Sequence, residues 1–152
     1  MGNAWNYCTN TAVKRASRRL GQLYDAVLAP SGLRATQCAL LTQIRLSDGP
    51  TLRGLAEAMA MDLSALGHTL KPLQRDGLVA LEPDPRDRRA KRVRLTAPGE
   101  ARLDAALDLW REAQAHFDAE FGAEKSAALR ATLERLASPE FAAAFTAAGG
   151  RH

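Results

Sequence analysis

The chain of 152 residues is long enough for one compact domain, or for two small lobes that share a core. A hydrophobic fraction of 46% excludes a disordered chain, and an aromatic fraction of only 5% means that aliphatic side chains must build the core. The net charge of +4 is a mild basic excess, compatible with a nucleic-acid partner and equally with a solvated basic surface.

Two helices are predicted near the start of the chain. Residues 11–29 carry apolar side chains at spacings of three and four, which is the period of an amphipathic helix. The run Ala29-Pro30-Ser31-Gly32 consists largely of helix breakers and should end this helix. A second helix is expected to begin at Thr36 and to stop at the turn-forming residues 47–50.

A pair of short helices joined by a tight turn is predicted next. An apolar stripe over residues 52–59 indicates a helix of two to three turns. Asp62 is expected to cap the following helix, over 63–76, because its carboxylate can accept from backbone N–H groups of the first turn. Gly77 supplies the left-handed residue that ends it. Pro72 lies inside this span, so the helix either kinks there or ends early.

The pattern then changes to a β-hairpin. Residues 78–82 and 92–95 are predicted strands, joined by a loop rich in turn-forming and charged residues. The basic charge of the chain is concentrated in and beside this loop, at Arg86, Arg88, Arg89, Lys91, Arg92 and Arg94. Asp87 is expected to brace one of these arginines by a bidentate hydrogen bond. A solvated turn is the alternative, but the loop directly follows a two-helix unit, which favours a binding surface.

A long helix is predicted after the hairpin, with Thr96 as its cap and Pro98 in its first turn. Its seam advances by alternating steps of four and three, through Leu103, Leu107, Trp110, Gln114, Phe117 and Phe121. Such a heptad-like seam is typical of packing against another helix, which a second chain can supply. Gly122 interrupts the seam, another helical stripe covers 129–136, and Pro139 should mark its end.

The order of helix, turn, helix, strand, basic loop and strand predicts a winged helix-turn-helix, within a mostly α fold of the α+β winged-helix kind. The second helix of the pair, about 10–12 Å wide, fits the roughly 12 Å major groove of B-DNA. The exposed residues expected to contact DNA from this helix are Ser64, Ala65, Gly67, His68 and Lys71. Arg86, Arg88 and Arg89 of the loop can enter a minor groove or pair with phosphates.

For single residues, roles other than base recognition are alternatives. His68 could be an ordinary exposed residue, and Ser64 could cap the helix or contact a phosphate. Two cysteines, Cys8 and Cys38, are too few for a disulfide framework in a chain of this length. Cys8 is expected to be inert unless Lys14 or Arg15 stabilises its thiolate. The polar start of the chain lacks a signal segment and no apolar run reaches membrane length, so we expect a soluble cytoplasmic protein without a membrane partner.

Nothing in the sequence predicts catalysis. The three histidines are scattered without metal-ligand spacing, and neither a phosphate-cradling glycine loop nor a nucleophile elbow is present. We therefore expect no catalytic residue, no metal and no cofactor. The rival to a DNA-binding regulator is a helical protein–protein adaptor whose winged-helix lobe has lost DNA binding.

Several runs of this sequence resemble the MarR family of bacterial transcription regulators. The most specific is Asp84-Pro85-Arg86-Asp87-Arg88-Arg89, followed by Val93-Arg94-Leu95-Thr96 and Gly99. Further matches are Tyr24-Asp25, residues 32–37, Gly54-Leu55-Ala56, Asp62-Leu63-Ser64 and Asp76-Gly77-Leu78-Val79. The resemblance covers nearly the whole chain. It implies a single MarR-like domain over 1–152, with a DNA-binding lobe at 36–96 and dimerisation helices at 5–35 and 97–147.

The same resemblance implies a homodimer that binds double-stranded DNA at a pseudo-palindrome. It also implies repression that is relieved by a small ligand, often an aromatic acid or phenol, or by oxidation. By position, the residues that could line the family's ligand cleft are Arg15, Arg18, Cys38 and Trp110. The alternative makes Cys38 and Trp110 plain core and the arginines plain surface. Asn10 and Ala35 stand where the hydroperoxide-sensing branch has its reactive Cys and a Tyr, which argues against that mechanism.

Overall fold

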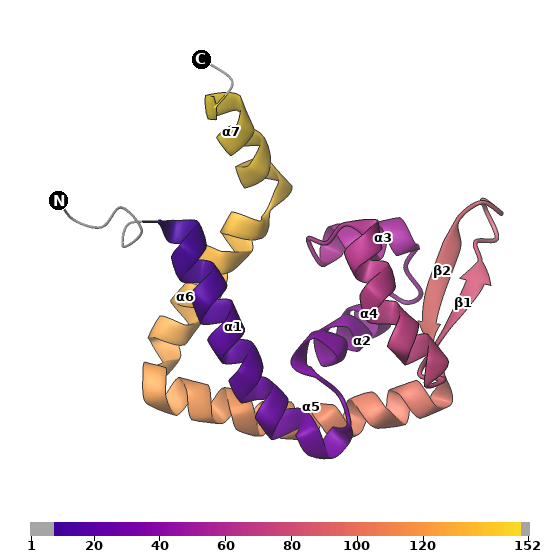
Figure 1. Cartoon of the computed structure of the whole chain (residues 1–152), viewed down its shortest axis with the longest axis horizontal. Coiled ribbons are helices and arrows are strands. Elements are labelled where there is room, and N and C mark those ends of the chain that lie inside the picture. Colours follow the sequence, from indigo (N-terminus) through magenta and orange to yellow (C-terminus); the bar gives the residue numbers. More distant parts are fainter. Residues whose placement is uncertain (1–7, 150–152) are drawn as a thin grey trace. The chain divides into compact units, whose positions relative to one another are not determined.

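The computed structural model describes residues 8–149 and divides the chain into two compact units, one ending at Glu112 and the other beginning at Ala113. Within the described residues the fold is mostly helical with one two-stranded antiparallel sheet, which confirms the predicted fold class (Figure 1). The elements in chain order are α1 (Thr9–Leu28), the 3-10 helix η2 (Ala29–Ser31), α2 (Ala35–Leu46), α3 (Leu52–Ala58), α4 (Leu63–Arg75), β1 (Val79–Pro83), β2 (Lys91–Leu95), α5 (Ala97–Phe121), α6 (Ala123–Ala137) and α7 (Pro139–Gly149).

The end of α1 is tied to the start of α2. The helix ends at the predicted breakers, where the Ser31 hydroxyl donates to the Leu28 carbonyl at 2.7 Å. Asp25, on the last turns of α1, accepts a hydrogen bond from the backbone N–H of Ala35 at 2.7 Å. This carboxylate satisfies one of the unpaired donors at the start of α2, so the two helices keep a fixed junction.

Both helices of the helix-turn-helix begin at a side-chain cap. Thr51 accepts from the backbone N–H of Gly54 at 3.1 Å, at the start of α3. Asp62 accepts from the backbone N–H of Ala65 at 2.7 Å, which confirms the cap predicted for α4. Between the helices Ala60 adopts a left-handed conformation with φ of 50°. The caps and this turn fix where α4 begins and therefore which of its faces is exposed.

The helix α4 runs through Pro72 to Arg75, so it does not end early. The proline removes one hydrogen bond, to the carbonyl of His68, in the last turns of the helix. Leu66, Leu70 and Leu73 are all buried on one face, and their packing holds the helix together across this position. Gly77 then takes the left-handed conformation expected of it, with φ of 70°.

A single hydrophobic core holds the first unit together. It includes side chains from α1 to α4, from both strands and from the first half of α5: Leu28, Leu40, Leu41, Ile44, Leu55, Leu66, Leu73, Val93, Leu103 and Ala106. The core therefore includes residues on both sides of the expected lobe boundaries at 35/36 and 96/97. Leu28 and Leu103, outside the expected lobe, fill the same core, and only long-range contacts reveal this.

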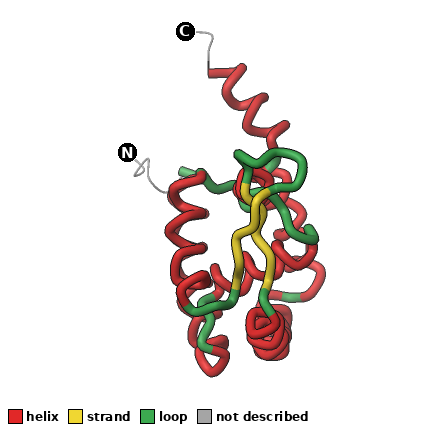
Figure 2. Tube along the Cα trace, turned by 90° about the vertical axis from the view of Figure 1, so that its right-hand side faces the viewer, coloured by secondary structure: helices red, strands yellow, loops and turns green. Residues whose placement is uncertain are grey.

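The hairpin is anchored to the helix-turn-helix. Its register pairs Val79 with Leu95 at the base and Pro83 with Lys91 at the tip. The N–H of Val93 donates to the carbonyl of Pro50 at 3.0 Å, and Thr51 forms a β-bridge with Arg92. Figure 2 shows the strands side by side, with their loop at the end away from the start of α5. The segment just before α3 is thus joined to β2 by one bridge and one backbone hydrogen bond.

The start of α5 is packed closely against the end of the helix-turn-helix. Thr96 accepts from the backbone N–H of Gly99 at 3.1 Å and donates to the carbonyl of Gly77, which confirms its predicted role as a cap. A Cβ atom at Gly99 would overlap the carbonyl oxygen of Leu78. Glycine is required here because two backbones approach each other directly.

The second unit contains the end of α5, all of α6 and α7. Asp118 accepts from the Gln114 amide at 2.9 Å, and Arg130 donates to the hydroxyl of Ser126, which is fully buried, at 2.6 Å. The stripe predicted over 129–136 lies in α6. After Ser138 the chain enters a further helix, α7, and the Ser138 hydroxyl accepts from the N–H of Phe141 at 3.2 Å in its first turn. No described helix is both long and apolar enough to span a membrane.

Replacing Gly99 by alanine should lower the free energy of unfolding by about 1–3 kcal/mol, because the new methyl group overlaps backbone that has no free space. Gly67 of α4 is the matched control, since a Cβ there meets nothing within 4 Å. Gly67→Ala should raise stability by about 0.5–1 kcal/mol through helix propensity. Urea unfolding of both variants measures the contrast, and equal effects would contradict this account of Gly99.

Candidate nucleic-acid interface

The face of α4 opposite the core carries the residues that the sequence analysis predicts to contact DNA. Ser64, Gly67, His68 and Lys71 are exposed, and Ala65 is half-buried. They recur at steps of three and four, so they lie along one side of the helix. The open space around Gly67 lets another molecule approach the backbone closely at this point.

The loop between the strands, residues 84–90, forms an ordered tip that we call the wing. Two carboxylates shape it by accepting from backbone N–H groups: Asp84 from Arg86 at 2.8 Å and Asp87 from Arg89 at 2.9 Å. The loop closes where the N–H of Asp84 donates to the carbonyl of Ala90 at 2.9 Å. Backbone turns held this way leave the arginine side chains free to project.

The expectation that Asp87 braces an arginine side chain is wrong, because its carboxylate is used by the backbone turn. The brace belongs to Asp84, which is only 5% exposed. The Nε of Arg92 donates to Asp84 at 2.9 Å, and its Nη1 donates to the carbonyl of Gly49 at 2.8 Å. Sequence spacing alone could not show which of the two aspartates pairs with an arginine. Asp84 directly follows β1, however, and a carboxylate next to a strand is more readily buried than one at a loop tip.

These contacts lower the pKa of Asp84. The backbone N–H of Arg86 is the largest cause, and the guanidinium of Arg92 adds a hydrogen bond and a favourable charge. Both favour the ionised carboxylate over its protonated form. Asp84 therefore stays charged in the folded protein at an acidic pH at which an aspartate with an ordinary pKa would already be protonated.

The basic run of the sequence separates into two groups. Arg92 is paired with Asp84, and Arg94 lies between Asp48 at 3.2 Å and Glu82 at 3.5 Å. Arg86, Arg88 and Arg89 are exposed, and their side chains have no ion pair among the residues that the structure describes. Leu63, the first residue of α4, lines the same groove as Arg89, so the wing tip lies beside the start of that helix.

Of the four residues expected in a ligand cleft, the two arginines lie together and the other two lie elsewhere in the first unit. Arg15 and Arg18 share a shallow, open depression on α1 with Arg19. Cys38 is buried in the core, and Trp110 of α5 is 40% exposed. Burial raises the pKa of the Cys38 thiol. The pKa of the Cys8 thiol is lowered, and hydrogen bonds from Thr11 contribute more to this than the positive charge of Lys14.

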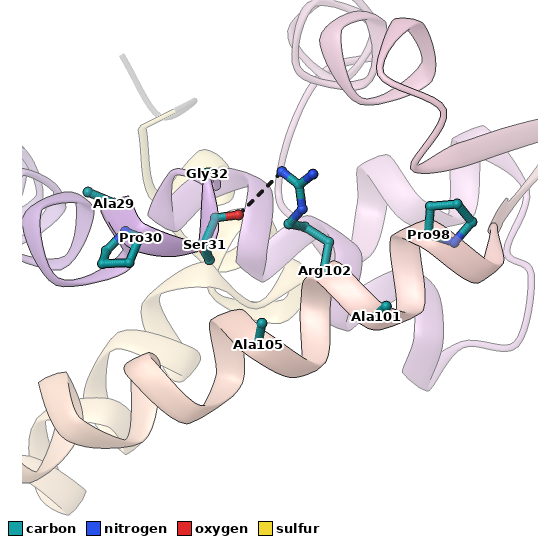
Figure 3. A pocket seen from close by; sticks show the side chains of 8 residues that line it. All are labelled: Ala29, Pro30, Ser31, Gly32, Pro98, Ala101, Arg102 and Ala105. Carbon is teal, nitrogen blue, oxygen red and sulfur yellow. Dashed lines mark hydrogen bonds between the residues drawn. The ribbon is translucent and has the colours of Figure 1, made fainter.

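Another concavity, which sequence reasoning missed, lies where α5 passes the end of α1 (Figure 3). Its walls are mostly small residues, and Arg102 crosses it to donate to the carbonyl of Ser31 at 3.3 Å. The guanidinium also fills the space beside Gly32, where a Cβ would meet it at 2.8 Å. This arginine closes the junction between α1 and α5, and the sequence pattern carried no signal for that role.

The exposed face of α4 beside a basic, anchored hairpin defines a winged helix-turn-helix protein. The model of the MarR family matches residues 33–91. The transcriptional regulator MOSR of M. tuberculosis, solved in complex with DNA, is 37% identical with a TM-score of 0.80, over 90% of this chain and 98% of its own. A mutant of MarR from E. coli, complexed with operator DNA, is 25% identical with a TM-score of 0.75, over 84% and 91%.

A probable transcriptional regulator from Pseudomonas aeruginosa is 26% identical with a TM-score of 0.74, over 85% of this chain and 96% of its own. Comparison with curated proteins gives no match. The chain belongs to the MarR family, whose members are DNA-binding transcription regulators and not enzymes.

Asp84→Asn should destabilise the protein at neutral pH, because the Arg92 guanidinium loses its charged partner. The pKa of the Asp84 carboxyl is lowered in the folded protein. Its contribution to the free energy of unfolding is therefore complete above the ordinary aspartate pKa of about 3.9 and is lost as the pH falls through the lowered pKa of the folded state. The difference in the free energy of unfolding between wild type and Asp84→Asn should therefore become smaller at acidic pH. Urea unfolding at neutral pH and below about pH 3 measures this shift. Asp87→Asn, whose amide oxygen can still accept from Arg89, is the control, and a difference independent of pH would contradict the brace.

Proposed function

We propose that the protein is a homodimeric, ligand-responsive repressor that binds a pseudo-palindromic operator. The observation that carries this proposal is the exposed face of α4 beside the unpaired arginines of the wing. In the bound state α4 enters the major groove, and the wing reaches the flanking backbone or minor groove. The family relationship and the two relatives crystallised with DNA support this arrangement.

The residues of α4 suit different kinds of DNA contact. His68 and Ser64 offer hydrogen-bonding groups to base edges, and the methyl group of Ala65 suits contact with a thymine methyl. Gly67 permits close approach, while Lys71 reaches a phosphate or a guanine. On the wing, Arg86, Arg88 and Arg89 supply charge that is independent of base sequence.

The proposed dimer is supported by apolar side chains that each unit leaves exposed. On the helices expected to form the dimer, those of the first unit are Val13, Leu23 and Trp110, and those of the second are Phe121, Leu133, Phe141 and Phe145. Leu46 of α2 and Leu63 of α4 are also exposed, outside those helices. In α7 no residue is buried, and Phe145 is 74% exposed. An isolated helix of this length is marginal in water, so a second chain is the natural cover for it. We accordingly assign 36–96 to DNA binding and 5–35 and 97–147 to dimerisation.

A dimer presents two copies of α4 related by a twofold axis. The operator should therefore contain two inverted half-sites, with centres about 34–36 Å apart, which is one turn of DNA.

For the effector we propose a small aromatic or phenolic acid. Arg15 and Arg18 lie on one open depression of α1, where two guanidinium groups can pair with a carboxylate. Trp110 offers an aromatic surface, while Cys38 contributes to the core and not to an accessible wall. Salicylate and related acids, added to the DNA-binding assay below, should release the wild-type protein and should act less on Arg15→Gln.

Replacing Arg88 and Arg89 together by alanine should weaken binding to promoter DNA and reduce its dependence on salt, because fewer counterions are displaced from phosphates. Fluorescence anisotropy over a range of salt concentrations measures both effects. Lys125→Ala on α6 is the control for loss of positive charge, since its exposed side chain lies outside the helix-turn-helix. An unchanged salt slope would remove the wing from the interface. A wild-type protein that binds no DNA at low salt would favour the adaptor alternative.

The protein should sediment as a dimer at micromolar concentration, because burial of the exposed phenylalanines and Trp110 favours association. Phe141→Ser with Phe145→Ser, both on exposed positions of α7, should shift the equilibrium toward monomer without unfolding the winged helix. Sedimentation velocity over a dilution series measures this, with circular dichroism as the check on folding. A wild-type monomer would contradict the proposed assembly.

A further inference from the structure

An open groove lies between the first turn of α3, the start of α4 and the wing. Its cavity volume is about 550 Å³. Three cationic side chains from separate parts of the sequence line it, namely Arg53 of α3, Arg89 of the wing and Lys91 of β2. Neither Arg53 nor Lys91 belongs to the contacts proposed above, and the sequence pattern gave Arg53 no role.

The backbone around these cations is held firmly. Thr51, two residues before Arg53, caps α3 and forms a β-bridge with Arg92, the neighbour of Lys91. The bridge is extended by the hydrogen bond from Val93 to Pro50. Arg53 and Lys91 therefore start from backbone positions that the fold fixes relative to each other, although 38 positions of sequence separate them.

The three cations are free to bind an anion. All are exposed, and no ion pair or side-chain hydrogen bond engages any of them among the residues that the structure describes. Asp87 is the one acidic residue on the lining, and its carboxylate accepts from the backbone N–H of Arg89. Three positive charges against one negative leave the groove with an excess of +2, which favours a singly charged phosphodiester.

We propose that this groove binds one phosphate of the DNA backbone, held by Arg53, Lys91 and Arg89 at the point between α4 and the wing. The inference rests on the proposed DNA-binding function and adds a backbone site to it. A phosphate clamped here sets how far the duplex stands from the start of α4. The contact carries no base sequence information, and it fixes the orientation and register of the helix in the groove.

The test compares Arg53→Gln and Lys91→Gln with wild type by fluorescence anisotropy. The probes are two labelled duplexes of unrelated sequence, each about 30 base pairs, which exceeds two half-sites one turn apart. Each substitution should weaken binding to both duplexes equally. The slope of log K against log salt should become shallower by about 0.9 for each protomer engaged. Thermal unfolding should be unchanged, because both side chains are unpaired and exposed.

Two control variants sharpen the result. Lys125→Gln on α6 removes the same charge far along the chain and should leave the slope unchanged. Asp87→Asn keeps an acceptor for Arg89 and removes the one negative charge of the groove, so it should tighten binding. If wild type binds and the Arg53 and Lys91 variants match Lys125→Gln, the phosphate site is refuted and the proposed function stands. Weakening on only one duplex would also refute it. If wild type binds neither duplex at low salt, the site and the proposed function fall together.

Discussion

The guanidinium of Arg92 joins three segments that would otherwise move independently. It binds the buried carboxylate of Asp84 where β1 passes into the wing, and it binds the carbonyl of Gly49 in the connection between α2 and α3. A two-stranded hairpin is marginally stable on its own in water. With this brace and the Val93–Pro50 hydrogen bond, the hairpin becomes part of the helix-turn-helix. The distance between the wing arginines and α4 is therefore a property of the fold and not of a flexible loop.

The same brace explains how a loop that contains two aspartates can still present positive charge. Asp84 is matched by Arg92, and Asp87 is directed to a backbone N–H. Arg94 is held between Asp48 and Glu82 at the base of the hairpin. The acidic groups near the wing are thus used in shaping it, and the remaining cations extend without a partner. Net charge alone could not show this division, because it counts structural and projecting arginines alike.

Local patterns predicted the elements well, and long-range contacts account for what they missed. The cap at Asp62, the left-handed Gly77 and the cap at Thr96 depend on neighbours in sequence, so the residues themselves indicate them. The choice of Asp84 over Asp87 depends on burial, and the role of Arg102 depends on the passage of α5 beside η2. Neither leaves a periodic signal. Pro139 was expected only as an end, yet proline suits the first position of a helix equally, and α7 begins there.

The core also connects α4 to the helices expected to form the dimer. Leu28 at the end of α1 and Leu103 of α5 fill the same core as Leu66 of α4. Arg45 of α2 strengthens this connection through ion pairs to Asp104 at 2.7 Å and Glu100 at 3.4 Å on α5. Because a close-packed interior has few voids, a displacement of α1 or of the first half of α5 would also displace α4. In the proposed dimer, an effector bound at these helices would change DNA affinity only if it bound more tightly to one spacing of the two recognition helices than to another. In the proposed dimer, regulation would therefore depend on where the two copies of α4 are placed, without a change in the shape of the recognition helix itself.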